Sequence, residues 1–297
     1  MDDKFKFKGT GKGRYCPLSV VKHMSNTLFI GKVYHYFEEL PSTNDWAAQL
    51  VAQSSTSPPL LGGSRGAAKT KPPEGTVVRA ANQTAGRGQL GSQWHSAAGD
   101  NLLLSIILYP TWLEVQAQFY LSMSVALALN DVIATLDIGH WTLDIGHSIK
   151  WPNDLYLNDQ KTAGILIQNS LSGAQLQTSI VGIGLNVNQL EFPADLPNAT
   201  SLAAAFGQKF DLDIVAARLF ECVERRYLQL KAGNRAAIKD EYEANLWRRG
   251  KTSRFVRTAD GSVLEGVILG VTGRGLLRVE MEVGVGEFEV KELGFLM

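Results

Sequence analysis

The segment from Thr84 to Trp94, TAGRGQLGSQW, combines three glycines with one arginine directly after an apolar run. Gly86, Gly88 and Gly91 have no Cβ, so backbone N–H groups there can approach an anion closely. Arg87 adds a planar guanidinium that can hold a carboxylate or a phosphate with two hydrogen bonds. The spacing is neither that of a P-loop nor GxGxxG. Taken alone, the segment is compatible with an anion-binding turn and equally with a tight turn that has no function.

A second polar segment, KWPND, runs from Lys150 to Asp154. Lys150 is expected near the end of a strand, and Pro152 forces the following stretch to start afresh. Asn153 and Asp154 then offer side-chain oxygens. An ordinary turn would explain these residues as well.

The third segment, KTAG, begins at Lys161 within DLYLNDQKTAGILIQ. This stretch predicts a hairpin that turns around Asn158 to Gln160 and brings Lys161 and Gly164 beside Asp154. A lone lysine before a strand is usually a solvated edge residue. The cluster of a lysine, a carboxylate and a glycine is therefore more informative than Lys161 by itself.

The spacing of the cysteines and histidines does not match that of a metal site or a disulfide framework. The two cysteines, Cys16 and Cys222, have no CxxC spacing, so neither a disulfide framework nor a zinc site is expected, and a reducing cytoplasm fits best. The five histidines show no HExxH or paired-ligand spacing, which predicts no transition-metal site; they are at positions 23, 35, 95, 140 and 147.

Elements that would position the polar segments can be identified from the apolar pattern. Ser42 followed by Asp45 resembles a capping box, and the segment DWAAQLVAQ behind it has helical spacing. The segments TVVRAANQ, NLLLSIIL and LQTSIVGIGLNVN are rich in Val, Ile and Leu and are bounded by turn residues, which predicts strands. FYLSMSVALALNDVIATL predicts a helix with a buried face.

The two ends of the chain differ in texture from its middle. Residues 1–23 are basic and Gly-rich without apolar periodicity, so we expect a disordered extension and a physiological start at Met24; detection of peptides from residues 1–23 in the native protein would contradict that start. Residues 54–74 are dense in Ser, Pro and Gly and predict a mobile surface insertion. Residues 198–246 have a helical pattern, which is expected to complete a first domain over residues 24–246.

Residues 247–297 predict a second domain made of short strands. The segments SRFVRT, SVLEGVILGV, LLRVEME and EFEVKEL are separated by turns at Asp260-Gly261, Gly273 to Gly275 and Gly284 to Gly286. This pattern is typical of a small antiparallel β-barrel.

Composition limits the classes of function. A chain of 297 residues with 45% hydrophobic content can bury one large core and a smaller one. Lys plus Arg and Asp plus Glu both number 29, which argues against a nucleic-acid binder and against a polybasic membrane anchor. No apolar run approaches the roughly 20 residues that span a bilayer, and the first residues lack the apolar core of a signal peptide.

The ordered motifs GRGQLG with Trp94, KWPND and KTAG resemble those of biotin protein ligases, over residues about 28 to 297. STND at Ser42 to Asp45 and GIGLNVN at Gly182 to Asn188 are similar to pocket segments of the same family. The resemblance implies an α+β fold, with a mixed β-sheet and packed helices of the class II aminoacyl-tRNA synthetase-like type, followed by the small barrel. Its order and spacing carry the inference, since no motif would be convincing alone.

The resemblance also implies roles for individual residues. Ser42, Thr43, Asn44 and Gln83 are similar to family residues that bind biotin, whose ureido ring presents two donors and one acceptor. Ser42 would also cap a helix, whereas Gln83 has no competing structural explanation from the sequence. The further biotin-binding residues implied are Gly86, Arg87, Gly88, Gln89, Lys161, Gly164, Gly182 and Gly184.

For the reaction itself, the resemblance implies catalytic roles for Lys161, Arg87 and Asp154. Lys161 and Arg87, with Mg²⁺, would offset the repulsion between the biotin carboxylate and the α-phosphate of ATP, and Asp154 would position Mg²⁺, position the incoming lysine or make a structural hydrogen bond. The implied nucleotide-binding residues are Arg87, Trp94, Lys150, Asn153 and Asn186.

This chain departs from the family pattern at Gln89 and Leu90, where some members carry a second arginine. The loop therefore has one fewer fixed positive charge, and we expect a looser hold on the acyl-adenylate. Gln89 can still hydrogen-bond biotin or phosphate.

The implied partner is the biotin carrier domain of an acyl-CoA carboxylase, and the protein would be a monomer or a homodimer. The alternatives are a lipoate protein ligase, a transcriptional regulator and a non-catalytic nucleotide-binding module. The short stretch before Ser42 leaves no room for a helix-turn-helix domain, so no DNA binding is expected. No membrane association is expected either.

Overall fold

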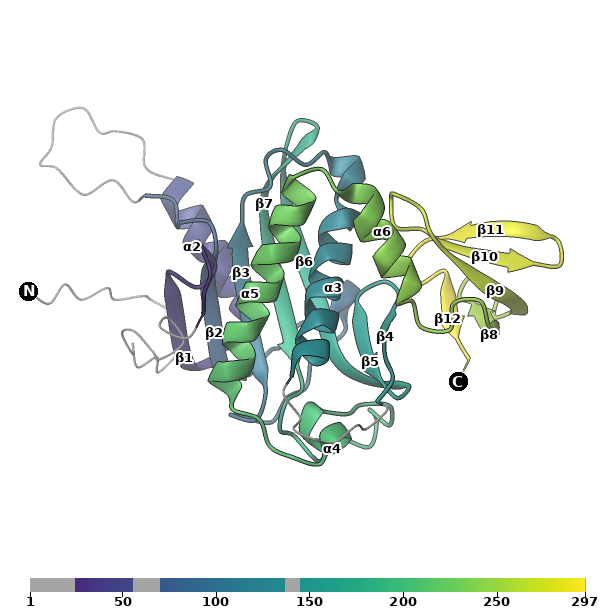
Figure 1. Ribbon diagram of the computed structural model, residues 1–297, viewed down its shortest axis with the longest axis horizontal. Coiled ribbons are helices and arrows are strands. Elements are labelled where there is room, and N and C mark those ends of the chain that lie inside the picture. Colours follow the sequence, from purple (N-terminus) through teal and green to yellow (C-terminus); the bar gives the residue numbers. More distant parts are fainter. Residues whose placement is uncertain (1–24, 56–69, 137–144, 297) are drawn as a thin grey trace, which may run out of the picture.

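The computed structural model describes residues 25–55, 70–136 and 145–296. The expected extension over residues 1–23, the start at Met24 and most of the insertion 54–74 lie outside these residues. Two sheets with helices around the larger one form the fold (Figure 1). The expected mixed α+β class is confirmed.

The larger sheet has seven strands in the order β1-β2-β3-β7-β6-β5-β4. Its strands are β1 (Tyr34–Leu40), β2 (Thr76–Gln83), β3 (Leu102–Leu108), β4 (His147–Lys150), β5 (Asp154–Leu157), β6 (Gln160–Ser172) and β7 (Gln175–Leu185). β1 pairs with β2 in parallel, whereas the other neighbours pair antiparallel. The strand β1 was not predicted from the sequence.

The β5–β6 connection is the expected hairpin. Asn158 and Asp159 have φ values of 46° and 65°, so these two residues form the turn and Gln160 already pairs with Leu157. Two successive positive φ angles are typical of the two-residue turns that match strand twist, and Asn and Asp tolerate them.

Helices cover both faces of this sheet (Figure 1). They are α2 (Thr43–Ser55), α3 (Phe119–Thr135), α4 (Leu202–Phe206), α5 (Leu212–Lys231) and α6 (Arg235–Ala244), with short 3-10 turns at η1 (Gln89–Gly91) and η2 (Val115–Ala117). α3 and α5 pack together over the main hydrophobic core, while α2 packs over a smaller cluster on β1, β2, β3 and β7. Because α2 runs through Ser55, the expected start of the insertion at residue 54 is corrected.

The segment Val115–Thr135 is long and apolar enough to cross a membrane by length and composition, with a mean hydropathy of 1.3. This corrects the expectation that no segment approaches that length. In the fold, 67% of its most apolar window is buried against the rest of the protein. Its apolar residues are thus used in the core, where α3 packs against β4, β5 and β6 and against α5 and α6.

The smaller sheet has five antiparallel strands in the order β11-β10-β9-β8-β12. They are β8 (Thr252–Arg257), β9 (Val263–Val271), β10 (Leu277–Met281), β11 (Gly284–Phe288) and β12 (Leu293–Phe295). Within the described part of the chain β11 and β12 are the two edges and do not pair with each other. The expected barrel is therefore an open sheet here.

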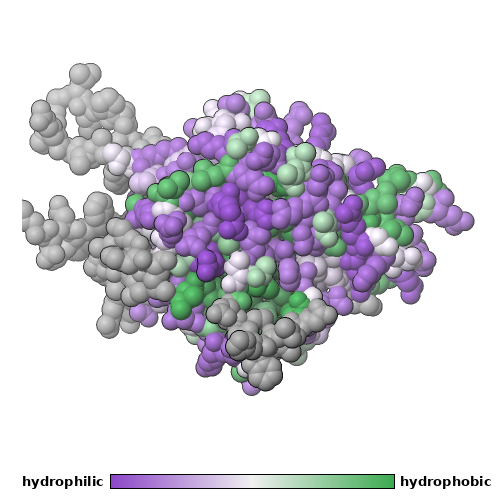
Figure 2. Space-filling view, in the orientation of Figure 1, coloured by the Kyte–Doolittle hydropathy of each residue, from purple (hydrophilic) through white to green (hydrophobic). Residues whose placement is uncertain are grey.

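Two details of this sheet differ from the sequence prediction. Gly284 and Gly286 were expected in a turn, but both lie in β11, and the turn before it consists of Glu282 and Val283. EFEVKEL was expected as one strand, but the backbone turns between Phe288 and Leu293, where Lys291 has a φ of 72°. Val283 is 91% exposed, and hydrophobic atoms gather over this end of the molecule (Figure 2).

Two contacts fix the smaller sheet against the first. The buried Glu243 carboxylate of α6 accepts the backbone N–H of Val271 at 2.8 Å. The Trp151 indole donates to the carbonyl of Gly275 at 2.8 Å. Trp151 precedes Pro152 through a cis peptide bond. The KWPND segment thus touches both sheets. The domain boundary at residues 246 and 247 stays a prediction.

Candidate active site

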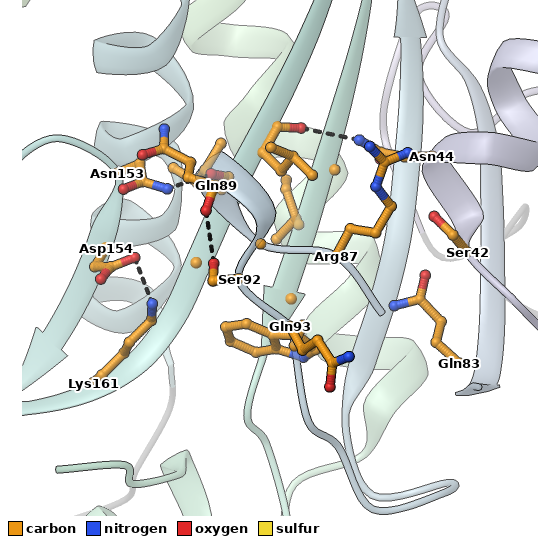
Figure 3. Close-up of a pocket in the computed structure, with 18 of the residues that line it drawn as sticks. Ser42, Asn44, Gln83, Arg87, Gln89, Ser92, Gln93, Asn153, Asp154 and Lys161 are labelled. Atoms are coloured by element: carbon orange, nitrogen blue, oxygen red, sulfur yellow. Dashed lines mark hydrogen bonds and ion pairs between the residues drawn. The ribbon is translucent and has the colours of Figure 1, made fainter. Parts of the chain in front are cut away.

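A cavity of about 370 Å³ lies beside the N-terminal end of α2, over the middle of the larger sheet (Figure 3). Its volume falls within the usual range for small-molecule sites. The residues that line it are Ser42, Thr43, Asn44, Gln83, Arg87, Gly88, Gln89, Ser92, Gln93, Trp94, Leu104, Lys150, Asn153, Asp154, Lys161, Gly164, Ile165, Leu166, Gly182, Ile183, Gly184, Val290 and Lys291. All of the predicted site residues are in this wall except Gly86 and Asn186.

Buried hydroxyl and amide groups form one end of the pocket. Ser42, Thr43 and Asn44 are each no more than 4% exposed, and the Ser42 hydroxyl accepts the backbone N–H of Asp45, as the expected helix cap. The Asn44 amide nitrogen donates to the carbonyl of Leu166 at 3.2 Å. These contacts hold the start of α2 against β6, so the polar groups are fixed before any ligand arrives.

Gln83 has a structural role that the sequence did not indicate. Its side-chain oxygen accepts the backbone N–H of Thr43 at 2.7 Å and the Thr43 hydroxyl at 3.1 Å. The Gln83 amide nitrogen is then left to face the pocket interior, as Figure 3 shows. The expectation that Gln83 has no structural explanation was wrong, because its oxygen caps α2 while its nitrogen remains a donor.

Ser105 supports this end from below and was missed by the sequence analysis. Its hydroxyl oxygen is fully buried and lies 2.6 Å from Asn44 Oδ1 and 2.8 Å from Thr43 Oγ1. A serine inside the apolar strand NLLLSIIL was the available signal, since a buried hydroxyl needs a polar partner.

Glycines form the floor of the pocket, because the side chains of Trp94 and Asn44 lie directly on β6 and β7 and leave no room for a Cβ. A Cβ on Gly184 would lie 2.5 Å from the Trp94 indole, and one on Gly164 would lie 2.9 Å from the same ring. A Cβ on Gly182 would overlap the Asn44 amide. Gly164 pairs with Gly184 across β6 and β7, so the two glycines make one flat patch under Trp94.

The Gly-rich segment is a short hairpin over the pocket. The Trp94 N–H donates to the Gly86 carbonyl at 3.0 Å, and the Gly88 N–H donates to the Ser92 carbonyl at 2.7 Å. Gly86 therefore forms the base of the hairpin and not the pocket wall. Between these two hydrogen bonds, Arg87 pairs with Gln93 in the hairpin. Its guanidinium donates to the carboxylate of Asp45 in α2 at 2.6 Å.

Lys161 and Asp154 form an ion pair of 2.8 Å at the other end of the pocket, where Figure 3 shows them pointing toward each other. Asn153 donates to the Ile165 carbonyl and thereby ties the KWPND segment to β6. The predicted cluster of lysine, carboxylate and glycine is confirmed as a spatial arrangement, since Gly164 pairs with Asp154. The catalytic roles stay predictions.

Lys150 reaches the pocket from a box of aromatic rings. Its ammonium lies 5.3 Å from the centre of Tyr156, 5.8 Å from Trp247 and 5.1 Å from Phe295. Burial lowers the pKa of Lys150, while the nearby Asp154 raises it. The rings favour the cation, because each presents the negative face of its π system. Phe295 comes from β12, so the smaller sheet contributes to this wall.

Asn186 lies beneath the site. It is 4% exposed, and its amide nitrogen donates to the Thr200 carbonyl at 3.0 Å. Its side-chain oxygen is buried without a hydrogen-bond partner. Asn186 is not among the residues that line the pocket, and its expected role in binding the nucleotide stays a prediction.

Val290 and Lys291, in the turn between β11 and β12, also line the pocket and were not predicted. Nothing in the local sequence marks them, because they reach the pocket only through the packing of the two sheets. Within the described residues no group of three or more His, Cys, Asp or Glu side chains is placed to hold a metal ion. Asp154 is the acid that lines the pocket.

Comparisons with known proteins identify relatives of this chain. The model of the "Biotin/lipoate A/B protein ligase family" matches residues 54–186. The chain is 35% identical over 221 residues to the bifunctional ligase/repressor BirA of Bacillus subtilis, covering 73% of this chain but only 65% of that protein. It is 32% identical over 208 residues to the biotin--[acetyl-CoA-carboxylase] ligase of Mycobacterium tuberculosis, covering 70% of this chain and 74% of that protein.

Among solved structures, the biotin protein ligase of Aquifex aeolicus in complex with biotin and ATP superposes with a TM-score of 0.65 at 26% identity. The match covers 89% of this chain and 99% of that one. Because the chain is 32% identical to a ligase of which it covers 74%, and the family model matches as well, the chain belongs to the biotin/lipoate A/B protein ligase family.

Proposed function

We propose that this protein is a biotin protein ligase. It joins biotin to ATP to form biotinyl-5'-AMP and then transfers biotin to a lysine of a biotin carrier domain. The observation that carries the proposal is the arrangement of one pocket, with buried hydroxyl and amide groups at one end and the Lys161–Asp154 pair at the other. The names of the relatives support the same activity.

The buried polar end favours biotin over lipoate. A ureido ring brings one carbonyl acceptor and two N–H donors, which can meet Ser42, Asn44 and the Gln83 amide nitrogen. The dithiolane ring of lipoate has neither a carbonyl nor an N–H group, so it would make none of these hydrogen bonds.

In the first step, a carboxylate oxygen of biotin attacks the α-phosphorus of ATP, and the bond to the bridging oxygen breaks as diphosphate leaves. Both reactants are anions. Four cationic residues line the pocket against one acid, and they are Arg87, Lys150, Lys161 and Lys291 against Asp154. This excess of positive charge offsets the repulsion, and Lys161 is the cation at the reacting end.

In the second step, the neutral amine of a carrier lysine attacks the carbonyl carbon of the mixed anhydride. The C–O bond to AMP breaks, the new amide nitrogen loses a proton, and AMP leaves. Asp154 is the acid at this end, so it can hold the incoming lysine after Lys161 turns to the phosphate. Magnesium bound to ATP fits the same carboxylate, because Mg²⁺ is commonly held by one or two carboxylates plus phosphates.

The test is incubation with biotin, MgATP and an acyl-CoA carboxylase carrier domain, followed by mass measurement of the carrier. We expect a gain of one biotinyl group, and no gain when the acceptor lysine of the carrier is replaced by Arg. Lipoate in place of biotin should give no gain. Lipoylation without biotinylation would establish the alternative ligase, and absence of diphosphate release would favour a non-catalytic nucleotide-binding module.

We also propose the cellular location and the oligomeric state of the enzyme. A cytoplasmic location, as a monomer or a homodimer without bound nucleic acid, suits an enzyme that uses ATP and modifies a carboxylase. Fractionation of native cells, light scattering with and without biotin and ATP, and a DNA-binding assay test these points separately.

A further inference from the structure

Asp45 and Arg87 connect two parts of the pocket that are far apart in the sequence. Arg87 belongs to the Gly-rich hairpin between Gly86 and Trp94, and Asp45 lies in the first turn of α2. Their Nη1 and Oδ1 atoms are 2.6 Å apart, although 42 positions separate them in the chain. The two side chains are 51% and 43% exposed. The pair therefore links the hairpin to α2 at the mouth of the pocket.

The Arg87 guanidinium lies at the polar end of the pocket, which is the end formed by the buried hydroxyl and amide groups of residues 42–44. Figure 3 shows Arg87 reaching toward Asn44, while Lys161 points at Asp154 on the other side of the pocket. The strand register explains the separation. Asn44 packs on Gly182, whereas Asp154 pairs with Gly164, which pairs with Gly184 two residues further along β7. A ligand whose uncharged ring fills the polar end carries its carboxylate toward the Lys161 end, so Arg87 must leave Asp45 to meet that carboxylate.

From this arrangement we infer that Asp45 is a positioning residue that holds Arg87 in the ligand-free enzyme and competes with the anionic group of the substrate for it. The inference rests on the proposed function for the identity of that substrate. When biotin or its adenylate binds, Arg87 exchanges the Asp45 carboxylate for the carboxylate or phosphate of the ligand.

The strength of the pair suits such an exchange. An ion pair with both partners this exposed contributes little, because water screens the charges and two long side chains must be ordered. An anion in the more enclosed pocket attracts a guanidinium more strongly than one at the surface. Arg87 is also the one arginine among the residues that line the pocket. The other hairpin residues in the lining, such as Gln89 and Ser92, carry no charge. Its distribution between Asp45 and the ligand therefore affects affinity directly.

The substitution Asp45→Asn tests this exchange, because it removes the charge and keeps the shape. We expect the dissociation constant for biotin, measured by titration calorimetry, to fall by about two- to fivefold. Biotin amide, which has no carboxylate, should bind the variant and the wild type equally. Asp45→Glu should restore the wild-type affinity for biotin.

Two controls separate the exchange from other effects. In an Arg87→Gln background, Asp45→Asn should have no further effect, whereas a general field effect on the anion would persist there. Glu114→Gln removes a comparable exposed pair, with Arg235 at 2.6 Å, and should leave biotin affinity unchanged. Thermal unfolding of each variant checks the helix cap.

Unchanged or weaker binding of biotin by Asp45→Asn, in protein that unfolds at the wild-type temperature, overturns the role of Asp45. So does equal tightening of biotin and biotin amide. Failure of the wild-type protein to bind biotin at all would instead overturn the proposed function. The two failures are distinguishable because the first leaves wild-type binding intact.

Discussion

Lys161 Nζ lies 2.8 Å from Asp154 Oδ1 because the β5–β6 hairpin turns in only two residues. Asp154 pairs with Gly164 and Tyr156 pairs with Lys161, so the two charged side chains leave neighbouring strands on the same face. The lysine side chain passes close to Gly164, where a Cβ would make an ordinary contact at 3.5 Å with Lys161 Cε. A reactive ammonium is thereby held extended at the pocket end.

The first prediction concerns Lys161. Lys161→Ala should lower the rate of biotinyl-adenylate formation by about 10²- to 10³-fold, because a positioned charge at the transition state is lost. The measurement is diphosphate release by purified protein at saturating biotin and ATP. Lys251→Ala, at an exposed lysine, is the matched control and should keep the wild-type rate. Near-wild-type turnover in Lys161→Ala would remove the lysine from the mechanism.

Gly184 provides a test of the pocket floor. Gly184→Ala should weaken biotin binding at least tenfold, because the new methyl group would lie 2.5 Å from the Trp94 indole and displace it into the pocket. Gly294→Ala is the control, since its nearest neighbour lies at 3.8 Å and its φ is not positive. Titration calorimetry with biotin gives both affinities. Equal affinities for the two variants would show that Trp94 does not need the flat floor.

We expect the buried charge of Lys150 to lower the free energy of unfolding of the wild-type protein. Lys150→Met should raise the free energy of unfolding by about 0.5 to 2 kcal/mol at neutral pH while weakening use of ATP. The exposed Lys209→Met should change neither quantity. Urea unfolding and ATP-dependent diphosphate release are the measurements. A less stable Lys150→Met protein would mean that the rings around the ammonium outweigh its desolvation.

The sign of the pH dependence follows from the same group. Burial lowers the pKa of Lys150 below its ordinary value, so above this lowered pKa the unfolded chain binds more protons than the folded one. The wild type therefore gains stability relative to Lys150→Met as pH rises from the lowered pKa toward 10.5, the ordinary value. The advantage of the variant should shrink over that window, and a constant advantage would contradict the lowered pKa.

Glu243 is predicted to hold the two sheets together. Its carboxylate accepts the Val271 N–H at 2.8 Å and pairs with Lys239 at 2.6 Å. Glu243→Ala should lower the free energy of unfolding by about 1 to 3 kcal/mol, because a buried N–H loses its partner. Glu287→Gln, on the exposed side of β11, should stay within about 0.5 kcal/mol of the wild type in urea unfolding. Equal stabilities would show that the contact is dispensable.

Several parts of the site were predictable because they depend on neighbours in the chain. The turn at Asn158 and Asp159 follows from residues that tolerate positive φ, and it alone brings Lys161 close to Asp154. The helix that begins after Ser42 follows from its cap. Close approach of the Trp94 ring to the glycines of β6 and β7 was not predicted.

Other parts depend on contacts between distant segments, which one sequence does not encode locally. The parallel pairing of β1 with β2, the capping of α2 by Gln83 and the arrival of Lys291 at the pocket belong to this class. The hydrogen bond from Asn186 to Thr200, which lies on a separate loop, was not predicted for the same reason.

By itself the sequence determined which residue types stand at strand ends and turns, because local backbone geometry follows from glycine, asparagine, proline and the apolar period. Only the tertiary structure decided which of these groups meet. Packing of α2 on the larger sheet brings Asp45 to Arg87, and packing of the smaller sheet against the larger one brings the ring of Phe295 to Lys150. Long-range packing fixes such pairs, since the free energy that holds them comes from the whole buried core and not from either segment.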